Sequence, residues 1–248
     1  MFDLTGKVAL VTGGSRGIGR ATAVALASQG ARVVLGYAAR EDAARQAVSA
    51  IEQAGGHAEA LRFDVADAEA ADRAITETAR RSGRLDILVC SAGVSSNALL
   101  LELTDAELER LLSVNTKGAL HCVRSALKTM IRTRSGRIIL MSSVAGDMGN
   151  AGQAAYAASK AALIGLGKSL AREYADRCIT VNTITPGFVE TDMTAGLNEQ
   201  QRATMLAGVP LRRPATAAEV AAAVVYLASD EAAYVTGHTL RVNGGLYV

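Results

Sequence analysis

The stretch Val8-Ala9-Leu10-Val11-Thr12-Gly13-Gly14-Ser15-Arg16-Gly17-Ile18-Gly19 decides how this 248-residue chain folds. Its first residues are apolar almost without a break, which is typical of a strand that a parallel sheet buries on both faces. The glycines permit a tight turn and a close approach to phosphate, and the next helix directs free N–H groups there. A glycine-rich turn without a ligand is the alternative, but the position between a strand and a helix favours a dinucleotide site.

The glycine spacing departs from two well-known nucleotide-binding patterns. The pattern Gly13-x-x-x-Gly17-x-Gly19 differs from the usual Gly-x-Gly-x-x-Gly dinucleotide fingerprint. It also lacks the Lys-Ser/Thr ending of an ATP-binding loop. Nucleotide hydrolysis is therefore disfavoured.

Short apolar runs alternate with stretches of helical length along the chain. This alternation predicts an α/β fold, a Rossmann-type doubly wound parallel sheet of about seven strands with helices on both faces, formed as a single domain over residues 1–248. The expected strands are Val8–Thr12, Arg32–Gly36, His57–Asp64, Leu85–Ser91, Gly136–Ser142, Thr180–Thr185 and Thr239–Val242. The expected helices are Gly17–Gln29, Ala43–Ala54, Ala68–Ser82, Asp105–Arg132, Gly152–Ala175 and Ala217–Ser229. The long segment Pro186–Pro214 breaks the alternation and is a candidate lid or substrate loop.

Composition argues against several classes of function. Apolar residues make up 50% of the chain, charged residues 20%, and the formal net charge is +2, so neither disorder nor binding to nucleic acid or a membrane surface is expected. A strand pattern begins within a few residues of Met1 and no apolar run approaches about 20 residues, so we expect a cytoplasmic protein without signal peptide or membrane span. Cys90, Cys122 and Cys178 lie far apart within apolar stretches, which predicts buried, reduced thiols. The histidines are dispersed, so no metal site is expected.

The residues after the second strand indicate which nicotinamide cofactor binds. Folds that bind NAD commonly place an acidic residue there, on the ribose 2′-hydroxyl. Here the strand runs into Tyr37-Ala38-Ala39-Arg40, with no acid before Glu41. Arg16 and Arg40 would both meet a 2′-phosphate with charge-assisted hydrogen bonds, so we expect NADP(H). For Arg40, decoration of the first turn of the next helix is the alternative.

Tyr156 and Lys160 stand one turn apart in an Ala-rich helix, and Ser142-Ser143 closes the preceding strand. The phenol and the ammonium therefore emerge on one helical face. A Lys⁺ beside a phenol favours the phenolate, so we expect Lys160 to lower the pKa of Tyr156 from about 10 toward the working range of an acid–base catalyst. Taken alone, the pair also fits an ordinary solvated helix face.

Taken together, these features resemble the short-chain dehydrogenase/reductase family, and the resemblance covers essentially the whole chain. The matching elements are Thr12-Gly13-Gly14-Ser15-Arg16-Gly17-Ile18-Gly19, Asp64-Val65, Ala92-Gly93, Asn115, Ser143, Tyr156-x-x-x-Lys160 and Pro186-Gly187. The resemblance implies an NADP-dependent oxidoreductase. It selects Ser143, thirteen residues before Tyr156, over Ser142 as the catalytic serine.

The resemblance also implies roles for single residues. Tyr156 would give a proton, Ser143 would hold the substrate oxygen, Lys160 would tune the phenol and bind the nicotinamide ribose, and Asn115 would hold a water. An Asn115 side chain bonded to its own helix backbone is the alternative. The implied cofactor-binding residues are Gly13, Ser15, Arg16, Gly17, Ile18, Gly19, Tyr37, Arg40, Asp64, Val65, Ser91, Ala92, Gly93, Tyr156, Lys160, Pro186, Gly187, Val189 and Thr191. For Asp64 a simple turn-forming role is the alternative.

Within the family, the likeness is greatest to reductases that act on 3-oxoacyl groups carried by acyl carrier protein in fatty acid biosynthesis. It rests on Pro186-Gly187-Phe188-Val189-Glu190-Thr191-Asp192-Met193, on the segment from Leu227 to Gly237 and on Val242-Asn243-Gly244-Gly245. It implies NADPH-dependent reduction of the 3-oxoacyl thioester at Ser143 and Tyr156, a homotetramer, and docking of the acidic carrier at Arg134 and Arg177. Ordinary solvated arginines are the alternative.

One departure and two other functions stay open. The family's usual Asn-Asn-Ala-Gly reads Cys90-Ser91-Ala92-Gly93 here, and Ser91 makes fewer hydrogen bonds than Asn. Another reductase of the family would act on acetoacetyl-CoA, a polyketide or a small carbonyl compound, with substrate choice in the loops Ser95–Leu101 and Thr194–Val209. A catalytically idle NADP-binding regulator is the other function, and the complete tetrad argues against it.

Overall fold

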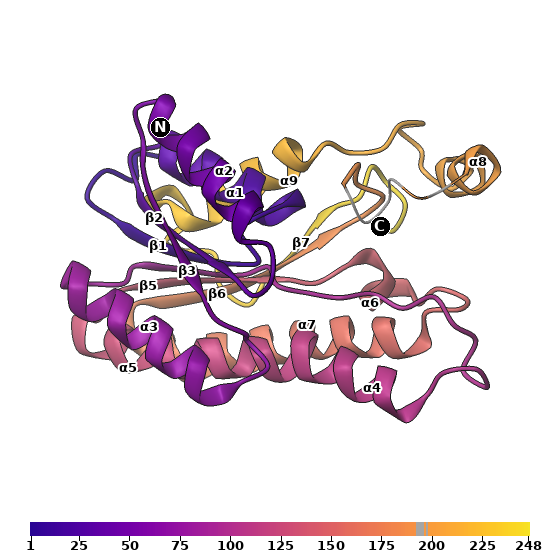
Figure 1. Ribbon diagram of the computed structural model, residues 1–248, viewed down its shortest axis with the longest axis horizontal. Helices are drawn as coiled ribbons and strands as arrows, with labels where there is room; N and C mark the ends of the chain where they lie inside the picture. Colours follow the sequence, from indigo (N-terminus) through magenta and orange to yellow (C-terminus); the bar gives the residue numbers. More distant parts are fainter. Residues whose placement is uncertain (192–195, 197) are drawn as a thin grey trace.

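Seven parallel strands form the middle layer of the molecule, in the order β3-β2-β1-β4-β5-β6-β7 (Figure 1). This computed structural model describes residues 1–191, 196 and 198–248. The strands are β1 (Val8–Thr12), β2 (Arg32–Tyr37), β3 (His57–Arg62), β4 (Ile87–Cys90), β5 (Gly136–Met141), β6 (Ile179–Pro186) and β7 (Thr239–Val242). The predicted doubly wound parallel sheet is confirmed.

The chain reverses its direction of travel across the sheet at β1. It builds outward from β1 to β2 and β3, then returns to place β4 on the other side of β1. Thr12 therefore lies in register with Gly36 on one side and Cys90 on the other. At such a switch point the loops diverge and leave a crevice at the carboxyl edge of the sheet, where ligands bind in folds of this kind.

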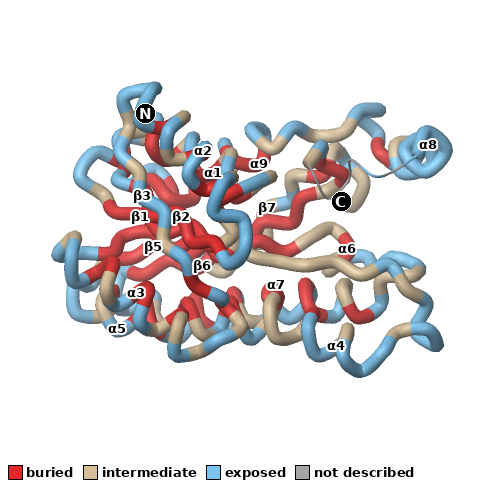
Figure 2. The backbone as a smooth tube through the Cα atoms, in the orientation of Figure 1, coloured by how far each residue is buried: buried red, intermediate tan, exposed pale blue. Residues whose placement is uncertain are grey.

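Helices cover both faces of the sheet (Figure 1). One face packs against α1 (Gly17–Ser28), α2 (Glu41–Gln53) and α9 (Ala217–Ala228), and the other against α3 (Ala68–Ser82), α5 (Gly118–Thr133) and α7 (Ala154–Tyr174). Buried residues lie along the strands and on the helix faces turned toward them (Figure 2). The core therefore holds the strand ends, and the loops that leave them, in fixed positions.

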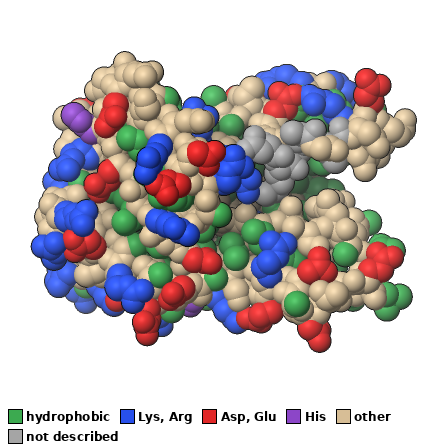
Figure 3. Space-filling model, in the orientation of Figure 1, with side chains coloured by type: hydrophobic (Ala, Val, Ile, Leu, Met, Phe, Trp, Pro, Cys, Tyr) green, Lys and Arg blue, Asp and Glu red, His purple; other side chains and the backbone are tan. Residues whose placement is uncertain are grey.

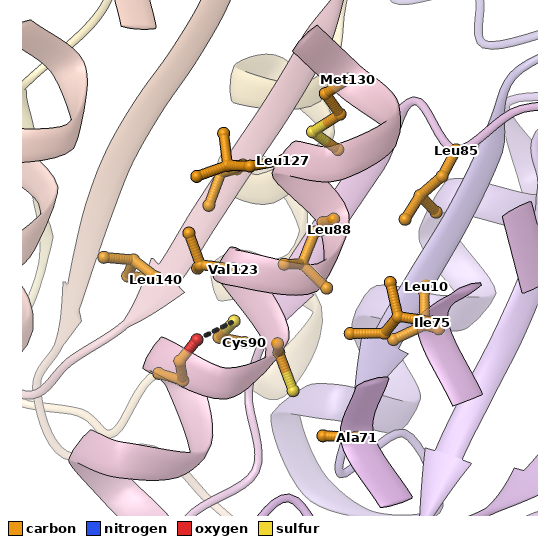
Figure 4. Packing of buried hydrophobic residues seen from close by; sticks show 14 of the residues in the cluster. Leu10, Ala71, Ile75, Leu85, Leu88, Cys90, Val123, Leu127, Met130 and Leu140 are labelled. Carbon is orange, nitrogen blue, oxygen red and sulfur yellow. Dashed lines mark hydrogen bonds between the residues drawn. The ribbon is translucent and has the colours of Figure 1, made fainter. Parts of the chain in front are cut away.

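Two of the cysteines lie in the core between the sheet and α5. The Cys90 thiol approaches the Ala119 carbonyl oxygen at 4.0 Å (Figure 4). Burial raises the pKa of Cys90 well above its ordinary value, and that of Cys122 to about 12, so both thiols stay protonated. The prediction for Cys178 is wrong, because it lies exposed in the turn before β6, in the left-handed conformation with φ of 58°.

The sequence predicts one regular helix over Asp105–Arg132, but the structure divides this stretch. The helix α4 (Asp105–Leu112) passes through a π-helical turn, η1 (Ser113–Lys117), into α5. Asn115 lies in this turn and is 1% exposed, with its side chain directed to neighbouring backbone. A π-turn inserts one extra residue into a helix and is frequent at functional sites.

Two helices lie where no helix is expected. The short helix α6 (Val144–Met148) follows β5, and α8 (Glu199–Ala207) lies within the candidate lid Pro186–Pro214, at the end of the molecule away from α3 (Figure 1). Asp192, Met193 and the first residues of the loop Thr194–Val209 lie largely outside the described residues. An isolated parallel bridge between Val189 and Ala215 brings the two ends of this segment together.

Among the described residues, no helix combines the length and apolar character needed to cross a membrane. The same residues contain no cluster of three or more His, Cys, Asp or Glu side chains placed to hold a metal ion. Acidic and basic side chains are interspersed over the face seen in Figure 3, in keeping with the net charge of +2.

Candidate active site

A cleft of about 650 Å³ opens at the carboxyl edge of the sheet, where the loops after β1, β2 and β4 meet. Its volume lies within the range of small-molecule sites, roughly 300–1,000 Å³. The predicted cofactor residues that line it are Gly13, Ser15, Arg16, Gly17, Ile18, Gly19, Tyr37, Arg40, Asp64, Val65, Ser91, Ala92, Gly93, Tyr156, Lys160 and Thr191. Residues separated by most of the chain thus share one cleft.

The loop after β1 brings the start of α1 to the floor of this cleft. Arg16 precedes α1 in an extended conformation, with φ of −152° and ψ of 170°, and its side chain makes no cap hydrogen bond. The first N–H groups of α1 therefore point toward the cleft, where they can donate hydrogen bonds to phosphate oxygens. A Cβ atom at Gly19 would lie 2.2 Å from the Gly13 carbonyl oxygen, so only glycine permits this close turn.

Thr12 ties the first loop to the loop after β4, a role that the sequence analysis misses. Its side chain is buried, and its hydroxyl oxygen accepts hydrogen bonds from the Ser91 and Ala92 backbone N–H groups, each at 3.0 Å. The strut joins the two loops on either side of the switch point. The sequence analysis names Thr12 as part of the glycine motif, but it does not predict which groups its hydroxyl binds.

Two arginines lie at the end of the cleft beyond β2. Arg16 is exposed, and no described acidic side chain forms an ion pair with it. Arg40 lies at the start of α2 and pairs with Asp42 at 3.3 Å, so both of its predicted roles fit its position. Asp64 has the turn-forming hydrogen bond of the alternative role, accepting from the Ala66 N–H at 2.9 Å, and it also lines the cleft.

Tyr156 and Lys160 project from the first turns of α7 toward the end of β5. The Lys160 Nζ donates to the Met141 carbonyl oxygen at 2.9 Å and lies 5.9 Å from the centre of the Tyr156 ring. The hydroxyl of Ser142, which the sequence analysis sets aside in favour of Ser143, donates to the Lys160 carbonyl oxygen at 2.7 Å. Residues at the end of β5 therefore bind both the side chain and the backbone of Lys160.

The predicted lowering of the Tyr156 pKa is contradicted by the structure. Burial raises the pKa of Tyr156 above its ordinary value, and a hydrogen bond with the Ser143 hydroxyl lowers it only in part. Burial also lowers the pKa of Lys160 to about 8. The ammonium is directed to the Met141 carbonyl oxygen, and burial is the main cause of both pKa shifts.

Asn115 supports the cleft from behind and does not line it. Its side chain pairs with the Val94 backbone through both its oxygen, at 2.8 Å, and its amide, at 2.9 Å. The amide also donates to Ser159 Oγ at 2.9 Å, which in turn donates to the Tyr156 carbonyl oxygen. The alternative role, a bond to its own helix backbone, is therefore wrong.

Other predicted residues lie at the rim or away from the cleft. Ser143 precedes α6 and caps it by accepting from the Ala145 N–H at 3.2 Å. Pro186 ends β6, Gly187 donates to the Val242 carbonyl, and the Val189 side chain packs in the core beside α9. The cleft residues that the sequence analysis does not assign are Thr12, Gly36, Ala38, Ala39, Phe63, Val94, Ser95, Arg110, Val114, Met141 and Ser142.

Arg134 and Arg177 lie at the opposite edge of the sheet from the cleft. Arg134 ends α5 just before β5 and donates to the Asp176 carbonyl oxygen at 2.7 Å, and Arg177 pairs with the Asp176 carboxylate at 3.3 Å. Tyr156 lies at the start of α7 and Arg177 just beyond its end. Its 21 residues make α7 about 30 Å long, so the basic pair is one helix length from the phenol.

Comparison with known proteins gives full-length matches. A family model described as enoyl-(acyl carrier protein) reductase matches residues 13–247. The chain is 48% identical over 247 residues to the 3-oxoacyl-[acyl-carrier-protein] reductase FabG of Escherichia coli strain K12, with all of both chains covered. It is 44% identical over 242 residues to the FabG of Staphylococcus aureus strain Mu50, with 98% of both chains covered.

Solved structures give the same picture. The crystal structure of gox2181 superimposes with a TM-score of 0.96 at 33% identity, covering 99% of this chain and 97% of that one. A putative NAD(P)-dependent gluconate 5-dehydrogenase from Beutenbergia cavernae with bound NADP gives a TM-score of 0.94 at 38% identity, with 99% and 98% covered. With a cleft at the switch point, Tyr156 and Lys160 beside it, and these full-length relatives, the chain belongs to the short-chain dehydrogenase/reductase family.

Proposed function

We propose that this protein is an NADPH-dependent 3-oxoacyl-[acyl-carrier-protein] reductase of fatty acid biosynthesis. The observation that carries the proposal is the placement of Tyr156, Lys160 and Ser143 where a dinucleotide cleft meets the end of β5. Full-length identity of 48% to a curated reductase of this name supports the substrate class. The overall reaction adds a hydride to the ketone carbon and a proton to its oxygen, which gives a 3-hydroxyacyl thioester.

The residues of the cleft fit NADP(H). The start of α1 offers backbone donors to the pyrophosphate, Arg16 and Arg40 lie at the end where a 2′-phosphate would sit, and the cleft runs on to Tyr156 and Lys160. When bound there, NADPH supplies the hydride. Ser15 and the glycines of the loop would hold the phosphates, and Thr191, whose side chain lies next to Gly17, would contact the nicotinamide end.

The protein's own part in the reaction is to hold the carbonyl and deliver a proton. Tyr156, with its pKa raised by burial, stays protonated at neutral pH and is a competent donor to the developing alkoxide. The Ser143 hydroxyl would donate to the same oxygen and stabilise its charge. Lys160, held by Met141 and Ser142, has its ammonium 5.9 Å from the centre of the Tyr156 ring and would hold the ribose.

The preference for NADPH is tested with two arginine variants. Arg16→Ala is expected to lower kcat/KM for NADPH far more than for NADH, because the 2′-phosphate loses a charge-assisted partner. Arg40→Ala should have the smaller effect, since Asp42 already pairs with that guanidinium. The measurement is kcat/KM with both cofactors, and equal efficiency with NADH and NADPH in the wild type contradicts the role given to Arg16.

The position of Arg134 and Arg177 far from Tyr156 changes how they would dock a carrier protein. Within one chain they lie about one helix length from Tyr156, because α7 separates them. We propose that they steer an acidic carrier toward a site on a neighbouring copy in a homotetramer, in the cytoplasm. Native mass spectrometry tests the tetramer, and a monomer that reduces the carrier-bound substrate at full rate overturns this docking geometry.

One experiment separates the candidate substrates. The rate of NADPH oxidation is measured with acetoacetyl carrier protein and with acetoacetyl-CoA, for the wild type and for the doubly charge-reversed Arg134→Glu/Arg177→Glu. A loss confined to the carrier-bound substrate supports docking, and equal activity throughout favours a CoA or small-ketone reductase. A 2-enoyl thioester is the third arm, since the matching family model is described as an enoyl reductase. Reduction of the enoyl but not the oxoacyl compound overturns the proposal.

A further inference from the structure

Directly after Ser143 lies a charged group to which the proposed reaction gives no part. The helix α6 has only five residues, and Ser143 caps its start through the bond to Ala145 N–H. Asp147 lies one turn further along the same helix. The helix packs closely on α7 at Gly146, and Asp147 gives it a second attachment on the side of β7, so a change at Asp147 acts on the helix that Ser143 caps.

Asp147 is buried with an unsatisfied oxygen. Its side chain is 7% exposed, and its Oδ2 has no hydrogen-bond donor among the described residues. The nearest cation is Arg241, whose Nε lies 3.6 Å from that oxygen. A buried carboxylate without a cation or donor is costly, so the carboxylate holds α6 close to Arg241.

Arg241 is itself held by the end of the chain. It lies on β7, in register with Thr185 of β6, and its guanidinium stacks 5.0 Å from the centre of the Tyr247 ring. The Asn243 amide donates to the Tyr247 carbonyl at 2.8 Å and fixes the turn that brings this ring back. Thr185 carries a second buried hydroxyl without a described partner at the same end of β6.

We propose that the Asp147–Arg241 pair is a positioning element that ties α6, and with it the Ser143 hydroxyl, to the C-terminal strand. The pair bridges the end of β6, because β6 lies between the strand that leads into α6 and the strand that carries Arg241. The last residues of the chain thereby set the position of the oxygen-binding hydroxyl. This inference rests on the proposed role of Ser143 in carbonyl reduction.

The test is a double-mutant cycle with Asp147→Asn, Arg241→Ala and both together. Each single change is expected to lower kcat for 3-oxoacyl reduction about tenfold, since small displacements of a positioned group carry losses of this order. The double variant should lose the same tenfold, not a hundredfold, because both changes break one contact. Arg241→Lys keeps the charge and should recover much of the rate.

Two further measurements separate positioning from general stability. The dissociation constant for NADPH, followed by its fluorescence, should stay within about twofold, since neither residue lines the cofactor cleft. Arg241→Ala should lower the melting temperature more than the double variant, because it alone leaves Asp147 buried and uncompensated. The matched control is Glu69→Gln with Arg73→Ala, an exposed pair at 3.3 Å on α3, which should change neither kcat nor melting temperature.

The outcomes are distinct. Multiplying losses in the double variant, an unchanged kcat, or a loss of NADPH affinity in step with kcat overturns the positioning role. A wild-type protein that reduces no 3-oxoacyl substrate overturns the proposed function first, and the inference with it. A tenfold, non-additive fall in kcat with intact cofactor binding supports both.

Discussion

Two groups of polar side chains at opposite edges of the sheet differ in burial and in partners. At the carboxyl edge, Thr12 and Asn115 are buried and satisfied by backbone partners, and Lys160 is buried against a carbonyl. At the amino edge, Arg134 and Arg177 lie at the surface around Asp176, whose side chain is 70% exposed. The first group is held in fixed geometry by its partners, and the second lies in water, where only its charge would act on an approaching carrier.

This contrast predicts how substitutions should differ between the edges. Removing a buried group leaves its partner unsatisfied, which costs more than the lost bond itself. Removing a surface charge changes little, because water replaces the lost partner. Large effects on turnover should therefore come from the carboxyl edge, and small effects limited to carrier recognition from the amino edge.

The largest effect is expected from Tyr156→Phe. The ring keeps its packing and loses only the hydroxyl that donates the proton, so turnover should fall by about two or more orders of magnitude. Binding of NADPH should persist, which fluorescence titration measures. Near-normal turnover in this variant would remove Tyr156 from the proposed mechanism and erase the contrast between the edges.

The next effect is a pH dependence set by Lys160. Its pKa is lowered to about 8 by burial, so the ammonium is lost as the pH rises through that value. If the charged form is required, kcat/KM should fall about tenfold per pH unit above this point. Tyr156 titrates above its ordinary value and cannot account for this limb. Lys160→Arg keeps its charge to higher pH and should move the limb upward, and an unmoved limb would assign it to another group.

The stability of the folded state should show the same ionisation with a definite sign. Between pH 8 and the ordinary value of 10.5, the unfolded chain keeps the Lys160 proton that the folded chain releases. The free energy of unfolding should therefore increase, and the folded state become more stable, as the pH rises through this window. Urea denaturation of the wild type and of Lys160→Met at several pH values measures it. An identical pH dependence in both proteins would contradict the buried ammonium.

A smaller effect is expected from Thr12→Val, which keeps the shape and removes the hydroxyl. The Ser91 and Ala92 N–H groups lose their acceptor, which should cost about 1–3 kcal/mol of stability. Binding of NADPH should weaken as well. Thr12→Ser keeps the hydroxyl and is the positive control. Thr133→Val at the amino edge removes a hydroxyl with three carbonyl neighbours that lies near water, and it should cost little. Equal losses at Thr12 and Thr133 would show that the edges do not differ.

The sequence predicts the helices and strands well and the long-range polar contacts poorly. The bounds of β1, β7 and α3 match their predicted ranges, because apolar runs and helical periodicity are local signals. The cleft-lining positions of the glycine loop, Tyr156 and Lys160 follow from motif and spacing.

What the sequence does not predict depends on tertiary contacts. Asn115, in the π-turn, pairs with Val94 of another segment, and the raised pKa of Tyr156 follows from burial. The helix α6 and the exposure of Cys178 are likewise set by how the strand ends are connected. Val94 is 21 residues from Asn115, so no local pattern predicts this pairing, whereas the Ser143 cap of α6 is a local signal that the sequence analysis does not use.

The smallest effect is expected from Asp176→Ala at the amino edge. The change removes the carboxylate that pairs with Arg177 but leaves the backbone carbonyl that binds Arg134. An exposed pair of this kind contributes about 0.5 kcal/mol or less, so urea denaturation and turnover of acetoacetyl-CoA should both stay near wild type. With the carrier-bound substrate the freed positive charge should raise kcat/KM slightly, most at low salt. A loss of acetoacetyl-CoA turnover would show that this edge is coupled to the cleft through α7, and the separation of the two edges would then fail.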